Sequence, residues 1–125
     1  AAIHAGWRGL VHGIIERTIH TLNLPTTDLL VWLGPAIGPT KFEVGEDVFT
    51  EFTQHSREAE SAFTSMPNNK WLANLYTLAR QRLNALGVNN ISGGDYCTYS
   101  QDNLFFSYRR DKGATGRMAS VIWIT

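Results

Sequence analysis

The apolar positions in the first third of the chain predict two strands separated by a helix. Residues 1–4 and 29–33 are short runs rich in apolar side chains. The second run is apolar at every position, as is typical of a central strand packed on both faces. Between them, residues 10–22 carry apolar side chains at the three- and four-residue spacing of an amphipathic helix. Residues 34–39 alternate glycine and proline with small or apolar side chains and are predicted to form a shaped loop.

The rest of the chain predicts helices followed by strands. Residues 44–52 favour a helix with its apolar side chains on one face, and residues 56–63 continue as a weaker helix. The clearest amphipathic helix covers residues 72–86 and ends at a glycine. Short strands are expected at 88–91 and 118–124. This order of elements predicts a mixed α/β fold, of the α+β kind.

Composition indicates an ordinary globular chain and excludes several classes of protein. The 125 residues are 43% hydrophobic and 18% charged, which is enough for one core. Eleven basic residues balance eleven acidic ones, so no binding to nucleic acid or to a membrane surface by charge is expected. The single cysteine excludes a disulfide framework, and no apolar run is long enough for a membrane span. These features predict a cytoplasmic protein.

His4 is the first candidate for chemistry. It ends the first predicted strand, where α/β folds place functional side chains, and a glycine turn follows it directly. A neutral imidazole there could ligate a metal or act as a general base. The alternative is a partly buried histidine whose hydrogen bonds are satisfied by its neighbours. No other histidine, cysteine or carboxylate lies at a ligand-like spacing from His4.

Arg8, flanked by Gly6 and Gly9, is the second candidate. A guanidinium just before a helix start, with glycines that let a ligand approach the backbone, could bind a phosphate or a carboxylate. Alternatively Arg8 pairs with an acidic neighbour. The basic segment 108–117 offers the same choice between an anionic substrate and a solvated or salt-bridged surface. Cys97 could be a nucleophile, but no base is evident, which favours a small buried core residue.

Four blocks of the sequence resemble one known family. Residues 2–9, Ala-Ile-His-Ala-Gly-Trp-Arg-Gly, resemble the signature of the YfiH family, also called laccase-like polyphenol oxidase or peptidoglycan editing factor. Three further blocks match in the same order: residues 33–39 with 42–45, residues 95–98, and residues 105–111 with 115–119. The resemblance implies layered mixed β-sheets with flanking helices, similar to the cysteine-hydrolase domain of cytotoxic necrotizing factors.

The resemblance also implies a metal centre that these residues hold only in part. The family binds zinc, or copper, through a His-Cys-His set, and the last histidine of that set matches His4. The other two ligands lie upstream in family segments that do not occur here, and Cys97 belongs to a different block. We therefore expect residues 1–125 to be the C-terminal part of a single YfiH-like domain without its N-terminal part. Such a chain would not retain the metal alone, and would need the missing half or self-association.

Several activities follow from the resemblance. The leading one is metal-dependent purine nucleoside chemistry: phosphorolysis of adenosine, inosine, guanosine or methylthioadenosine, and deamination of adenosine. His4 would be the catalytic metal ligand, and Arg8 with Gly6 and Gly9 would bind phosphate or substrate. The alternatives are a Cys-His amide hydrolase that edits misincorporated amino acids in peptidoglycan precursors, a copper polyphenol oxidase, and a non-catalytic fragment.

Overall fold

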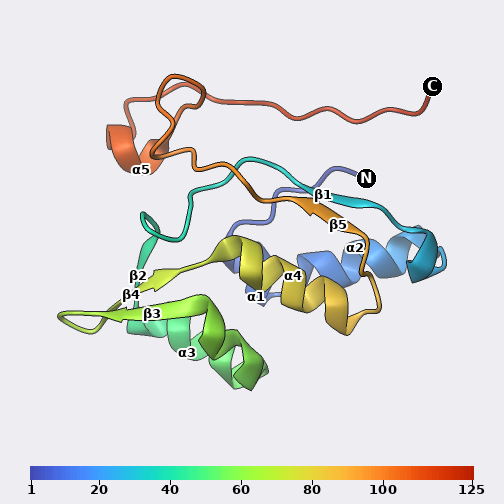
Figure 1. Ribbon diagram of the computed structural model, residues 1–125, viewed down its shortest axis with the longest axis horizontal. Coiled ribbons are helices and arrows are strands. Elements are labelled where there is room, and N and C mark those ends of the chain that lie inside the picture. The colour runs from blue at the N-terminus through green and yellow to red at the C-terminus, as the bar shows by residue number, and fades with distance from the viewer.

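The strands of this protein divide between two small sheets of different kinds. A computed structural model describes all residues 1–125 and places β1 (Val31–Leu33) parallel to β5 (Ile91–Gly93). The second sheet is antiparallel, with β4 (Lys70–Ala73) between β2 (Glu43–Gly45) and β3 (Phe63–Met66). Figure 1 shows most of the helices between and below these sheets. The predicted mixed α/β class is therefore confirmed.

The antiparallel sheet is the main element that the sequence did not predict. The expected helix at 56–63 is a 3-10 helix, η2 (Arg57–Ala62), and Phe63 already begins β3. The turn into β4 is tight because Asn68 and Asn69 adopt positive φ of 62° and 54°, a conformation that asparagine tolerates better than most residues. Strands of three and four residues are too short to show an alternating pattern in the sequence.

The expected N-terminal helix over 10–22 is two helices. α1 (Trp7–Val11) is followed by α2 (Ile14–Leu22), and Gly13 between them has a φ of 84°. A left-handed residue interrupts the helical hydrogen-bond ladder, and glycine adopts it without a steric cost. The apolar stripe continues across the break because both helices pack against the same core.

The core lies where α1 and α2 meet α3 (Glu46–His55) and α4 (Leu75–Ala85). Its largest fully buried side chains are Phe52, Leu10, Leu78 and Val88. The predicted helices at 44–52 and 72–86 are thus confirmed with shifted starts, because Val44 and Leu72 belong to strands. The Asn74 side chain caps α4 by accepting a hydrogen bond from the Thr77 amide at 3.0 Å.

Both ends of the chain depart from the prediction. Residues 1–4 and 118–124 were expected to be strands, but neither segment pairs with another strand. The last segment is extended and runs along the side of the molecule that carries β1 and β5 (Figure 1). The strand expected at 88–91 begins only at its last residue, as β5. Two short elements complete the fold, η1 (Thr26–Asp28) and α5 (Tyr108–Asp111).

The burial of β1 also differs from expectation. Val31 and Leu33 pack against the core, whereas Leu30 and Trp32, which alternate with them, are exposed. The run 29–33 is therefore covered on one face instead of two.

None of the helices has the length and apolar character that crossing a membrane requires.

Candidate functional site

The structure brings the predicted site residues His4, Gly6 and Gly9 into contact. The His4 imidazole lies over Gly6, so closely that a Cβ on Gly6 would be 3.2 Å from Nε2. A Cβ on Gly9 would lie 3.6 Å from the His4 backbone oxygen. A side chain at position 6 would therefore force the imidazole to shift, whereas a Cβ at position 9 would only make ordinary van der Waals contact with the His4 backbone.

His4 is free to interact with a ligand. The residue is exposed in the segment before α1, and its imidazole makes no hydrogen bond or ion pair within the protein. The alternative of a partly buried histidine satisfied by its neighbours is therefore wrong. An imidazole in this setting can accept a proton, donate one or ligate a metal.

Arg8 is also unpartnered by acidic groups. Its guanidinium stacks over the Trp7 ring at 4.5 Å from the centroid, and the side chain is exposed. The two ion pairs of the protein join Arg82 to Glu16 and Arg110 to Asp111, so Arg8 does not pair with a carboxylate. Its donors remain available for an anion. α1 has only five residues, so anion binding here would depend on the guanidinium more than on the helix.

The residues present do not make a complete metal centre. No three histidine, cysteine, aspartate or glutamate side chains converge within the 125 residues. A catalytic zinc needs three protein ligands, and His4 offers one nitrogen. Any zinc or copper held at His4 would need donors from outside these residues.

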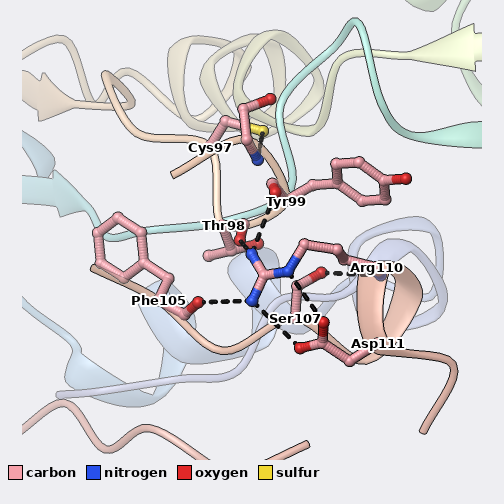
Figure 2. Close-up of polar contacts among 8 residues, drawn as sticks. Cys97, Thr98, Tyr99, Phe105, Ser107, Arg110 and Asp111 are labelled. Carbon is pink, nitrogen blue, oxygen red and sulfur yellow. Dashed lines mark hydrogen bonds and ion pairs between the residues drawn. The ribbon is translucent and has the colours of Figure 1, made fainter. Parts of the chain in front are cut away.

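Arg110 has a structural task that the sequence did not reveal. Figure 2 shows its guanidinium surrounded by acceptors: it donates to the carbonyls of Thr98 at 2.8 Å, Tyr99 at 3.1 Å and Phe105 at 2.9 Å. It also binds both carboxylate oxygens of Asp111, at 3.0 and 3.1 Å. This hydrogen-bonded pair lowers the pKa of Asp111 and raises that of Arg110. With its donors directed inward, Arg110 does not serve an anionic substrate.

Cys97 joins two of the family-like blocks. Its Sγ accepts hydrogen bonds from the amides of Gly38 at 3.2 Å and Ser100 at 3.4 Å. Burial acts to raise the thiol pKa, but hydrogen bonds from Ser100, Gly38 and Tyr99 outweigh it, and the pKa is lowered. The residue is half-buried, so the expected buried core position is wrong. No histidine is among its partners, and the chain therefore contains no Cys-His pair at Cys97.

Tyr76 also links the two family-like blocks that Cys97 joins, and the sequence did not reveal this role. Its hydroxyl accepts a hydrogen bond from the Ala36 amide at 2.8 Å and donates to the Tyr96 carbonyl at 2.8 Å. Burial is the main cause that raises its pKa. The sequence did hold a signal for this role. Tyr76 lies on the apolar face of a predicted helix, and a hydroxyl group on such a face needs a polar partner.

Comparison with known proteins gives one consistent result over the whole chain. The family model described as multi-copper polyphenol oxidoreductase laccase matches residues 1–125. "Purine nucleoside phosphorylase YfiH" of Shigella flexneri is 52% identical over 124 residues, which are 99% of this chain and 50% of that protein. A purine nucleoside phosphorylase of Haemophilus influenzae is 50% identical over 125 residues, 98% of this chain and 51% of that protein. The chain spans about half the length of these curated relatives.

Solved structures agree on the fold. A crystal structure of a Neisseria meningitidis protein, 48% identical, superposes with a TM-score of 0.88 over 90% of this chain and 46% of that one. The hypothetical protein YfiH of Bacillus licheniformis, 30% identical, gives 0.82 over 90% of this chain and 45% of that one. With its whole length matched by the family model and its fold shared with solved members, the chain belongs to the YfiH family, the laccase-like polyphenol oxidoreductase family.

Proposed function

We propose that residues 1–125 serve a cytoplasmic purine nucleoside phosphorylase and supply the His4 and Arg8 side chains of its active site. The observation that carries this proposal is the 50–52% identity, over 98–99% of the chain, to relatives that bear this enzyme name. The exposed, unpartnered His4 and Arg8 beside two glycines support it, because both side chains are free for a substrate.

The proposed reaction exchanges one bond at the ribose for another. A phosphate oxygen attacks C1′ of the nucleoside, the C1′–N9 bond breaks, and the purine leaves with its bonding electron pair and takes up a proton. Arg8 would bind the phosphate through its guanidinium, and Gly6 and Gly9 would let the substrate approach the backbone. His4 would lie against the reacting groups, where its imidazole can hold a proton or a metal. The metal, zinc or copper, would complete its ligand set outside these residues.

Oxidation of phenols is the second candidate, because the matching family model is described as a polyphenol oxidoreductase. Adenosine deamination and amide hydrolysis of peptidoglycan precursors remain activities that the family resemblance implies. For the amide hydrolase, Cys97 offers no support, because no histidine is among its partners.

A chimera tests the proposal. Residues 1–125 replace the matching half of the Shigella flexneri relative, and the chimera receives inosine with phosphate, a muramoyl–serine conjugate, or a phenol with copper. We expect free base and ribose 1-phosphate in equal amounts, only when phosphate is present. Arg8→Ala should raise the KM for phosphate by about 10-fold or more, whereas Arg57→Ala, another exposed arginine, should not. Base release without phosphate, or product only from the other two substrates, would contradict the proposal.

A further inference from the structure

Gly6 lies between His4 and α1, and its backbone conformation does not require a glycine. Its φ is −66° and its ψ is 170°, an extended conformation that residues with a side chain adopt freely. Neither a left-handed turn nor a strained dihedral angle therefore accounts for the missing side chain at this position.

The helix itself would gain from a polar side chain at position 6. Gly6 is the N-cap of α1, and no side chain caps this helix. Serine, asparagine and aspartate are preferred over glycine at an N-cap, because their side-chain oxygen accepts a hydrogen bond from an amide of the first turn. The chain uses such caps elsewhere, with Asn74 for α4 and Ser107 for α5. The stability of α1 therefore favours another residue over Gly6.

The His4 imidazole occupies the place where a side chain on Gly6 would begin. A Cβ on Gly6 would lie 3.2 Å from Nε2 of His4 and 3.9 Å from each of the two ring carbons bonded to that nitrogen. The added atom would thus sit at the Nε2 corner of the ring. Because no hydrogen bond or ion pair within the protein holds the imidazole, the ring would give way before the backbone did.

We infer that Gly6 is a positioning residue for His4: its missing side chain lets the imidazole rest against the backbone at the start of α1 and leaves Nε2 uncovered for the reacting groups. This inference rests on the proposed function, which places His4 at those groups. It gives Gly6 a role through His4 instead of a direct contact with the substrate. A methyl group at position 6 would cover Nε2 or push the ring aside, and either change separates this nitrogen from its reaction partner.

A cycle of single and double substitutions in the chimera tests whether Gly6 acts through His4. The value of kcat/KM for phosphorolysis of inosine is measured for the parent, Gly6→Ala, His4→Ala and the double variant. We expect Gly6→Ala to lower kcat/KM by about 10-fold or more when His4 is present, and to have no further effect when His4 is alanine. An equal loss in both backgrounds, or no loss in the parent, would overturn the inference.

Gly45→Ala is the matched control for this cycle. Gly45 is the N-cap of α3, has a similar extended backbone with a φ of −85° and a ψ of 173°, and also lacks a capping side chain. A Cβ there would meet only the carboxylate of Asp47, an exposed side chain. Gly45→Ala should therefore keep the parent kcat/KM.

The stability of a serine variant separates positioning from a structural role. Gly6→Ser should lower kcat/KM as Gly6→Ala does, yet the 125-residue variant should unfold at the same urea concentration as the wild type or at a higher one. The reason is that serine caps α1 and also restricts the unfolded chain. If Gly6→Ser unfolds at a clearly lower urea concentration, the glycine is needed for folding and the inference is wrong.

Nuclear Overhauser spectroscopy of the 125-residue chain tests the geometry without the reaction. We expect cross-peaks from the Hδ2 and Hε1 protons of His4 to the α-protons of Gly6, because the imidazole rests on this residue. Their absence would overturn the inference, whatever the chimera catalyses. Cross-peaks together with a chimera that forms no ribose 1-phosphate would contradict the proposed function, while the placement of the His4 ring by Gly6 would stand.

Discussion

At the residue scale, the polar side chains differ in how far the protein itself uses them. Arg110 directs its donors to three carbonyls and to Asp111, and so fixes the segment between Cys97 and α5. Arg8 and His4 make no such bonds and remain available to a ligand. From the sequence, both arginines were possible anion binders. The sequence alone could not separate them, because it does not show which backbone carbonyls surround a guanidinium.

The lowered pKa of Cys97 predicts how the alkylation rate of its thiol depends on pH. Its hydrogen bonds from Ser100, Gly38 and Tyr99 stabilise the thiolate and lower the pKa. A lower pKa gives more thiolate at a given pH, so alkylation by iodoacetamide should reach half its maximal rate at a lower pH in the folded chain than in the urea-unfolded chain. The pH dependence of the alkylation rate measures this directly. A folded midpoint equal to or above the unfolded one would show that burial outweighs the hydrogen bonds.

At the scale of elements, the sequence correctly predicted the helices that a regular hydrophobic periodicity marks. The stripes over 10–22 and 72–86 mark real helices, and Gly34–Pro39 is an irregular loop as expected. The antiparallel sheet was missed because its strands are three or four residues long and adjoin helices. The two terminal strands were expected from composition alone, and strand formation also requires a pairing partner that these residues do not provide.

Gly13 separates α1 from α2 and carries a prediction about stability. Its φ of 84° is left-handed, and an added Cβ would meet no atom closer than 3.6 Å, so the cost of a side chain is conformational. Gly13→Ala should lower the free energy of unfolding by about 1 to 2 kcal/mol. Gly13→Asn should lower it less, because asparagine visits this region more readily. Urea denaturation of the three proteins checks the order, and an alanine variant as stable as the wild type would contradict the left-handed assignment.

At the scale of the whole molecule, the fold has a buried helical core and an uncovered sheet side. Sixteen side chains form the core among the helices and the antiparallel sheet. The β1–β5 face and the C-terminal segment remain exposed, although both are apolar. The chain spans about half the length of its curated relatives. The continuous apolar run at 29–33 predicted a central strand, whereas the structure covers this strand on one side only.

The most direct measurement concerns His4 in the chimera with the Shigella flexneri relative. The value of kcat/KM for phosphorolysis of inosine is determined for the parent chimera, for His4→Ala and for His55→Ala, which removes an exposed histidine at the end of α3. We expect His4→Ala to lower kcat/KM by about 100-fold or more, because the proposed function places the imidazole against the reacting groups. His55→Ala should retain the parent value. A His4→Ala chimera as active as the parent would show that His4 is not part of the active site.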